Sequence, residues 1–335
     1  MKALLCEGWN GYQGLTYTDV PAPLLPAGCV RIQVAYCTVS FGQVLVVAGK
    51  YQRKPPLPFV PGTEVSGVVR EVAPGVSGFK LGDRVVASLD WGGYGEDAVA
   101  SAETVWPVPD GISLRDAAVI PLTYGTAYAA LHWRAQLAEG ESLLVYGAAG
   151  GVGLPAVELG KLAGARVLAV ASSPSRLALA LERGADAGLQ HGEPDLAQRV
   201  KDLTAGRGAD VVFDPVGGEL FQQALRCTAP EGRVLLIGFA SGTIPQIPAN
   251  ILLVKSISVI GFNFGLYLGW TRTDERKRHA QRLRDMMAVL FGLLSAGKIR
   301  PTSSDCYALK DFASAFEAVE TGKSFGRVLI EVAEL

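Results

Sequence analysis

The segment that most constrains the fold of this chain is a glycine-rich turn at residues 143–153 (Leu-Leu-Val-Tyr-Gly-Ala-Ala-Gly-Gly-Val-Gly). Its first four residues are apolar and predict a buried strand, and a helical pattern at 154–163 follows the turn. Pro155 suits the first turn of that helix, where its missing N–H would have no partner in any case. A second β-rich run lies at 166–171. The segment therefore predicts a strand–turn–helix–strand unit.

This unit is typical of a dinucleotide-binding site. Glycines permit a tight turn and a close approach of the backbone to a pyrophosphate, while the helix N-terminus supplies N–H donors and partial positive charge. The alternative is a glycine-rich turn without a ligand. We expect the cofactor to contact the residues of the turn that follow the strand, namely Ala149, Gly150, Gly151 and Val152.

The end of the second predicted strand indicates which dinucleotide binds. An NAD site usually has an acidic residue about 20 residues after the glycines. Here no acidic residue occurs between Glu158 and Glu182, and the strand ends with Ser172, Ser173 and, three residues later, Arg176. Hydroxyl donors and one cation suit a 2′-phosphate, so we expect NADPH. The competing interpretation makes Arg176 a solvated residue of the next helix.

The order of predicted elements divides the chain into an α/β protein of two domains. Short strands between Gly/Pro loops, such as 30–34 and 65–72, predict a β-rich, partly open barrel in residues 1–118. Strands and helices alternate in residues 119–263, which predicts a Rossmann-type, doubly wound parallel sheet. Two helices and a closing strand in 264–335 are expected to rejoin the first domain.

Composition excludes several classes of protein. The 335 residues include 31 Lys and Arg against 32 Asp and Glu, and this near-neutral balance argues against nucleic-acid binding. Hydrophobic residues make up 49% of the chain and charged residues 19%, which excludes intrinsic disorder. The five cysteines form no CxxC pair, and we see neither a signal peptide nor an apolar run of about 18 residues. We expect a cytoplasmic protein that does not enter the membrane.

The chain resembles the zinc-free quinone oxidoreductase branch of the medium-chain dehydrogenase/reductase superfamily, a branch that includes zeta-crystallin. The resemblance covers essentially the whole chain and implies a GroES-like catalytic domain beside the Rossmann domain. It is carried by the N-terminal Met-Lys-Ala, by Pro-Gly-Thr-Glu-Val-Ser-Gly at 61–67, Gly-Asp-Arg-Val at 82–85, Ala-Ala-Gly-Gly-Val-Gly at 148–153, Asp-Pro-Val-Gly-Gly at 214–218 and Gly-Phe-Ala-Ser-Gly at 238–242.

The zinc ligands of the related alcohol dehydrogenases are missing from this sequence. Thr63 stands where their Gly-His-Glu motif has histidine, and no cysteine lies between Cys37 and Cys227 to form a structural zinc lobe. The chain contains three histidines, none spaced as a ligand pair. Because alcohol oxidation in that family relies on zinc as a Lewis acid, a zinc-free site is expected to reduce acceptors that are already electrophilic.

On the substrate side, the resemblance points to the loop that contains Ser40 and Tyr51. Ser40 replaces the asparagine of the family pattern and can still donate a hydrogen bond to a carbonyl oxygen, whereas Gln43 replaces its aspartate. Tyr51 is expected to stack on or hydrogen-bond a flat acceptor, or else to pack on the core. Thr126 is expected to hydrogen-bond the nicotinamide or its ribose.

Further cofactor contacts are carried over from the family. His191 stands near the expected adenosine phosphate, or is an ordinary surface residue. Phe239, Ala240 and Ser241 resemble the loop that covers the nicotinamide ribose, and Val216 is also expected to contact the cofactor. Phe262 and Phe264 are expected at the nicotinamide end, with core packing as the alternative, and Arg327 is expected to reach back to the cofactor.

Two surface features complete the predictions. A basic run at 272–284 is either a solvated helix face or a landing site for a phosphorylated substrate such as an acyl-CoA. The uncharged segment at 256–261 predicts an edge strand, and in the family this strand pairs with its twin across a homodimer axis.

The leading hypothesis for function is an NADPH:quinone reductase that needs no metal. A 2-alkenal, enone or enoyl-thioester (enoyl-CoA) reductase is the enzyme alternative, since it shares the fold and the hydride step. A non-catalytic NADPH-binding or structural protein is the third hypothesis.

Overall fold

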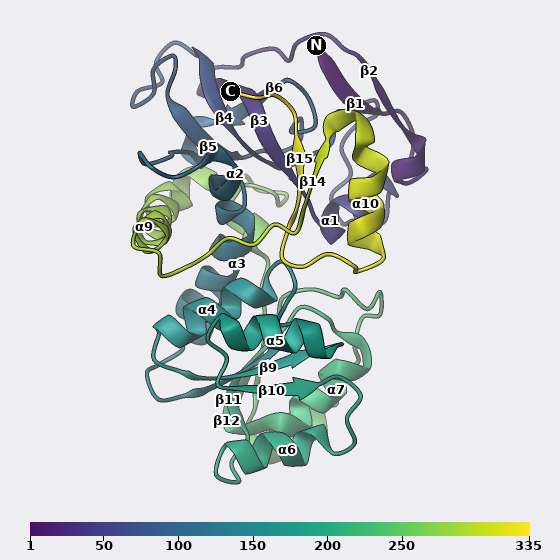
Figure 1. Ribbon diagram of the computed structural model, residues 1–335, viewed down its shortest axis with the longest axis vertical. Helices are drawn as coiled ribbons and strands as arrows, with labels where there is room; N and C mark the ends of the chain where they lie inside the picture. The colour runs from purple at the N-terminus through teal and green to yellow at the C-terminus, as the bar shows by residue number, and fades with distance from the viewer. The chain divides into compact units, whose positions relative to one another are not determined.

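The computed structural model describes all 335 residues, which form two compact units (Figure 1). The first unit contains Met1–Gly125 and Phe264–Leu335, and the second contains Thr126–Asn263. Residues 119–125, which the strand–helix alternation placed in the second domain, belong to the first unit. The backbone N–H of Leu122 donates a 2.7 Å hydrogen bond to Oε1 of Glu64, which ties this segment to the β-rich sheet.

The second unit is built on a six-stranded parallel sheet with the order β10-β9-β8-β11-β12-β13. Because β9 and β11 flank β8 while the chain winds outward in both directions, this is the expected doubly wound α/β fold. The strands are β8 (Ser142–Tyr146), β9 (Arg166–Ala171), β10 (Ala187–Gln190), β11 (Ala209–Asp214), β12 (Thr228–Leu236) and β13 (Ser258–Gly261).

Helices cover both faces of this sheet, as the near-continuous apolar character of its strands requires. On one face, Leu143 and Val167 lie against Gly160 of α4 (Gly153–Leu162), and α5 (Pro174–Glu182) contacts β9 and β10. On the other face, the strand residues whose side chains point away from α4 pack against α6 (Leu196–Leu203) and α7 (Gly218–Cys227). A further short helix, α8 (Ala249–Lys255), precedes the edge strand β13.

The first unit contains a seven-stranded sheet that does not close into a barrel. Its order is β14-β15-β3-β4-β5-β7, with β6 also paired to β3, and β1 and β2 form a separate hairpin. The strands are β1 (Lys2–Cys6), β2 (Leu15–Asp19), β3 (Cys29–Val39), β4 (Glu64–Val72), β5 (Arg84–Ser88), β6 (Asp97–Ser101), β7 (Val105–Pro107), β14 (Asp305–Ala308) and β15 (Val328–Glu331).

The C-terminal part of the chain completes the core of the first unit. Strand β15 pairs antiparallel with β3, and β14 adds to it in parallel. Phe316 of α10 (Phe312–Glu320) is fully buried and stacks on Tyr12, with ring centroids 5.5 Å apart. The remaining helices of this unit are α1 (Phe41–Val47), α2 (Leu114–Ala117) and α9 (Arg276–Ser295).

The chain passes from the first unit to the second through an unusual helix. Two π-helical turns, Ile120–Tyr124 and Ala129–Ala135, flank α3 (Gly125–Tyr128). Such turns often occur at functional sites.

Single 3-10 turns occur at Tyr12–Gly14, Ala102–Thr104, Phe264–Leu266 and Leu309–Asp311. None of the helices has the length and apolar character of a membrane-spanning segment.

One expected loop is a helix in the structure. The segment after Cys37 continues as strand to Val39, and α1 then begins at Phe41. The Ser40 hydroxyl caps α1 by accepting from the Gln43 N–H at 3.3 Å, and the apolar residues Val44 and Val47 are buried. The β-branched composition of this stretch concealed the helix, which tertiary burial and the serine cap stabilise.

Candidate cofactor site

The second unit contains a cavity of about 220 Å³ at the carboxyl ends of its central strands. The lining residues come from the last residues of β9, from the segments after β8, β9, β10 and β11, and from α7. The cavity therefore lies where the winding of the sheet reverses. The lining residues are Gly147, Ala149, Gly150, Val170, Ala171, Ser172, Arg176, His191, Val216 and Leu220.

The glycine turn beside this cavity permits an unusually close approach of helix α4 to β8. A Cβ atom on Gly153 would lie 2.1 Å from the carbonyl oxygen of Gly147, so no other residue fits there. Gly147 itself has a φ of +59°, and its carbonyl accepts a 2.8 Å hydrogen bond from the Gly150 N–H. No side chain caps α4 at Val152, while the Leu154 N–H donates to the Gly150 carbonyl at 3.1 Å. A helix N-terminus without a side-chain cap suits an anionic ligand.

A different set of groups lines the cavity at β9. The Ser173 hydroxyl caps α5 and lies 3.1 Å from the Ser175 hydroxyl. Arg176 is half-buried, and desolvation lowers the pKa of its guanidinium, which still leaves an arginine charged at neutral pH. His191 lies just after β10 and also lines the cavity. No lining residue is acidic, so the donor set fits a phosphate better than a ribose hydroxyl.

The structure brings together six of the predicted cofactor residues around this cavity: Ala149, Gly150, Ser172, Arg176, His191 and Val216. Gly151, Val152 and Ser173 are sequence neighbours of lining residues. Phe239, Ala240 and Ser241 lie on a loop beside Val216, and the N–H of Ser241 donates to the Val216 carbonyl at 3.0 Å.

Four further predicted cofactor residues are absent from the cavity lining: Thr126, Phe262, Phe264 and Arg327, the last of which is described below. Thr126 is half-buried on α3. Phe262 is half-buried and donates its N–H to the Leu236 carbonyl. Phe264 is buried in the first unit, with its ring centre 6.0 Å from that of Tyr267.

Some lining residues were not predicted from the sequence. Leu220 and Val170 are ordinary apolar residues of a helix and a strand, and no motif distinguishes them. Gly147 and Ala171 could have been identified by their positions, because each stands at the carboxyl end of a predicted strand.

The substrate-side candidates lie in the first unit. Ser40 and Tyr51 are both half-buried, and burial raises the pKa of Tyr51, which therefore stays protonated at neutral pH. Gln43 has a structural role, because its side chain donates to the Thr63 hydroxyl at 3.0 Å and accepts from the Gly62 N–H at 3.2 Å. Thr63, which stands at the histidine position of the alcohol dehydrogenases, is thus hydrogen-bonded to Gln43, which stands at the aspartate position of the substrate-side pattern.

Beside these residues, a buried carboxyl group holds several segments of the first unit together. Glu64 is fully buried, and its oxygens accept from the Thr38 hydroxyl at 2.6 Å and from the Leu122 N–H at 2.7 Å. The guanidinium of Arg327 lies 3.5 Å from the same carboxyl group. Burial raises the pKa of Glu64, while Arg327 opposes that shift. Arg327 thus has a defined partner within the first unit.

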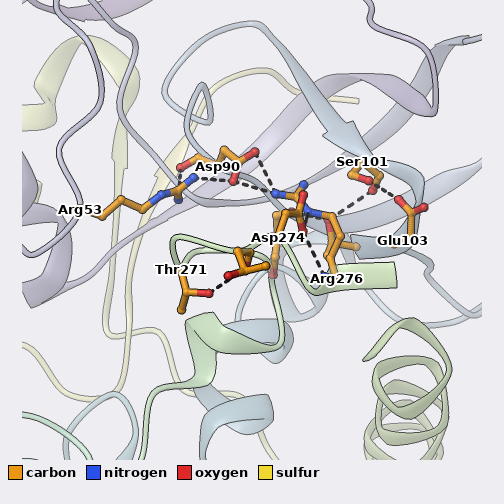
Figure 2. A network of polar contacts seen from close by, with 10 residues as sticks. Arg53, Asp90, Ser101, Glu103, Thr271, Asp274 and Arg276 are labelled. Atoms are coloured by element: carbon orange, nitrogen blue, oxygen red, sulfur yellow. Dashed lines mark hydrogen bonds and ion pairs between the residues drawn. The ribbon is translucent and has the colours of Figure 1, made fainter. Parts of the chain in front are cut away.

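An ion-pair network anchors the loop that carries Tyr51. Figure 2 shows Asp90 between two guanidinium groups, those of Arg53 and Arg276, at 2.5 and 3.1 Å. Arg276 also pairs with Asp274, and the Arg53 guanidinium lies 4.4 Å from the centre of the Trp91 ring. This network joins three segments that are far apart in the sequence.

Other charges of the basic run are paired close to α9. Arg278 pairs with Glu275, Arg284 donates to Gln281, and Arg282 lies over the Tyr267 ring.

Nowhere in the structure do three His, Cys, Asp or Glu side chains come together in an arrangement that could hold a metal ion.

Comparison with known proteins identifies the family. Residues 26–110 match the alcohol dehydrogenase GroES-like domain, and residues 151–280 match the zinc-binding dehydrogenase domain. The chain is 38% identical to quinone oxidoreductase-like protein 2 of Rattus norvegicus over 96% of its own length and 89% of the relative's. It is 31% identical to human quinone oxidoreductase over 91% and 89% of the two chains.

The solved structures agree with these matches. Escherichia coli quinone oxidoreductase complexed with NADPH superposes with a TM-score of 0.90 at 27% identity, over 99% of this chain and 100% of the other. The chain belongs to the zinc-free quinone oxidoreductase branch of the medium-chain dehydrogenase/reductase superfamily. It is an oxidoreductase with a GroES-like and a Rossmann domain.

The contact between Glu64 and Arg327 allows a direct test of the role of Arg327. Arg327→Met leaves a buried carboxylate without its cation, and we expect it to lower the free energy of unfolding by about 3–5 kcal/mol. Adding Glu64→Gln should restore part of that loss, because a neutral amide needs no cation. Urea unfolding of the two single variants and the double variant measures the coupling. Weaker NADPH binding with unchanged stability would instead make Arg327 a cofactor ligand.

Proposed function

We propose that this protein is an NADPH-dependent reductase that transfers hydride to quinones without a metal ion. The observation that carries the proposal is the composition of the cavity: a glycine turn beside an uncapped helix, and a guanidinium and hydroxyls at β9 with no carboxylate among the lining residues. The solved relative from E. coli was complexed with NADPH.

In this proposal the residues of the second unit bind and orient the cofactor. The N–H groups at the start of α4 bind the pyrophosphate, while Arg176, Ser172 and Ser173 bind the 2′-phosphate. When bound, NADPH supplies the hydride. The predicted contacts of Thr126 and of the loop of Phe239, Ala240 and Ser241 orient its nicotinamide half.

The residues of the first unit act on the acceptor. Ser40 keeps its hydroxyl proton available because the hydroxyl oxygen, and not the proton, is used in the helix cap. It can therefore donate to a carbonyl oxygen of a quinone, where negative charge develops as hydride arrives. The protonated Tyr51 hydroxyl can donate in the same way. The anchored loop would hold Tyr51 in a fixed orientation.

We expect NADPH oxidation to be fastest with a quinone. Turnover of 1,4-benzoquinone, a simple enone and crotonyl-CoA should decrease in that order, because only the quinone gains aromaticity and needs no protonation at carbon. Dialysis against a chelator should leave the rate with benzoquinone unchanged. Reduction of the thioester alone would support the enoyl-thioester reductase instead. Binding of NADPH without its oxidation by any acceptor would support a non-catalytic role.

The preference for NADPH is expected to depend on Arg176. Arg176→Ala should weaken NADPH binding about tenfold or more, since a hydrogen bond to a charged group contributes roughly 1.5–3 kcal/mol, and should leave NADH binding nearly unchanged. Fluorescence titration with both nucleotides measures this difference. Arg166→Ala, at the exposed amino end of β9, is the matched control. Equal weakening of both nucleotides by Arg176→Ala would contradict the assignment.

We further propose that the protein forms a homodimer through β13. This strand has no partner on its outer side within the sheet, and it follows a segment with highly exposed apolar side chains. Leu253 is 81% exposed and Val254 80% exposed, both on α8. An apolar surface beside an open strand edge is typical of a surface that another chain covers.

Leu253→Asp is expected to convert the dimer to a monomer in analytical ultracentrifugation, because it places a charge in the apolar contact. The variant should fold as the wild-type protein does, since the side chain of Leu253 is already exposed. Leu81→Asp, at a site 71% exposed in the first unit, should remain dimeric. A monomeric wild-type protein, or a dimeric Leu253→Asp variant, would exclude this interface.

A further inference from the structure

Asp214 is a buried carboxylic acid at the carboxyl end of β11, and the proposed chemistry makes no use of it. Its exposed fraction is 0%. One oxygen, Oδ1, accepts hydrogen bonds from the backbone N–H groups of Val216 at 2.8 Å and Gly217 at 2.9 Å. The other oxygen, Oδ2, is buried without a hydrogen-bond partner. Burial raises the pKa of this group. Such a residue is costly to keep in a core, so its contacts require an explanation.

The contacts of Asp214 shape the loop that follows β11. With two amides held by one oxygen, the chain turns sharply, and Gly217 and Gly218 both adopt positive φ angles, +70° and +60°. A Cβ atom on Gly217 would lie 2.9 Å from the ring of Phe239. The turn therefore brings the backbone directly against a second loop.

Backbone hydrogen bonds join these two loops into one wall. The N–H of Ala240 donates to the Pro215 carbonyl at 3.1 Å, and the N–H of Ser241 donates to the Val216 carbonyl at 3.0 Å. In the other direction, the N–H of Gly218 donates to the Thr243 carbonyl at 3.1 Å. Moving the first loop would therefore move the second.

This wall faces the glycine turn across the cavity. Val216 is one of the lining residues. A Cβ atom placed on Gly147 would meet Val216 at 3.5 Å and Pro215 at 3.6 Å, so the wall and the turn are already in near contact. The width of the cavity at this end therefore depends on where the Asp214 turn is held.

We propose that Asp214 is a positioning residue of the cofactor site, which holds the wall formed by residues 215–218 and 239–243 against the glycine turn. This inference rests on the proposed NADPH binding. The wall follows β11, whereas Ser172 and Arg176 follow β9 on the other side of β8. Asp214 should therefore affect NADPH and NADH equally, in contrast to Arg176.

The test compares Asp214→Ala with Asp210→Ala in the full-length protein. Asp210 lies at the opposite end of the same strand, where its carboxyl group accepts from the N–H and the hydroxyl of Ser142, and it is thus a matched control. Nucleotide affinity is measured by fluorescence titration. Hydrogen exchange of the ligand-free protein reports on the amides of Val216, Gly217 and Ser241.

We expect Asp214→Ala to weaken both NADPH and NADH about tenfold and to accelerate exchange of those three amides. Asp214→Asn keeps an oxygen acceptor and should restore most of the affinity. Asp210→Ala should lower the melting temperature and leave both dissociation constants unchanged. If Asp214→Ala does not fold, Asp214→Leu, which fills the space without an acceptor, gives the same comparison.

The outcomes separate this inference from the proposed function. Wild-type protein that binds neither nucleotide would overturn the proposed function and this inference with it. Wild-type protein that binds NADPH, together with an Asp214 variant of unchanged affinity or unchanged amide exchange, would overturn the inference alone. A loss of NADPH affinity without loss of NADH affinity would also contradict it, because the wall does not contain the 2′-phosphate residues.

Discussion

The close approach of α4 to β8 is the constraint on which the rest of the cofactor site depends. The carbonyl oxygen of Gly147 occupies the space that a side chain at 153 would need, so the helix can begin beside the strand only with glycine there. The N–H groups of the helix then lie next to the cavity without a side-chain cap. The ends of β9, β10 and β11 supply the remaining walls, because a parallel sheet gathers its carboxyl ends at one edge.

Buried carboxyl groups perform a related task in the two units. Glu64 accepts the N–H of Leu122 within a π-helical turn, and Asp214 accepts two N–H groups from the turn after β11. In each case a carboxyl group that is costly to bury fixes irregular backbone by accepting its N–H groups. Apolar packing forms the two cores, while these carboxyl groups determine where particular loops lie.

The regular elements of the second unit could be predicted because each combines an apolar pattern with a clear boundary. Strand β9 begins and ends at the predicted residues, and β8 ends, as predicted, at Tyr146 before the glycine turn. The helix α1 could not be predicted, because its valines favour strand and its stability comes from burial and from the Ser40 cap. The structure groups residues 119–125 with the first unit, through a contact with Glu64 that joins residues 58 positions apart and that no local pattern indicates.

The sequence by itself determined the strand–turn–helix unit at the glycine-rich turn and the family, since both reside in short contiguous motifs. Only the tertiary structure decided that Arg327 pairs with Glu64, that Gln43 binds Thr63, and that Asp214 supports a wall of the cavity. These assignments depend on which groups are buried together. Burial and hydrogen-bond partners arise from segments far apart in the chain, and local patterns do not encode them.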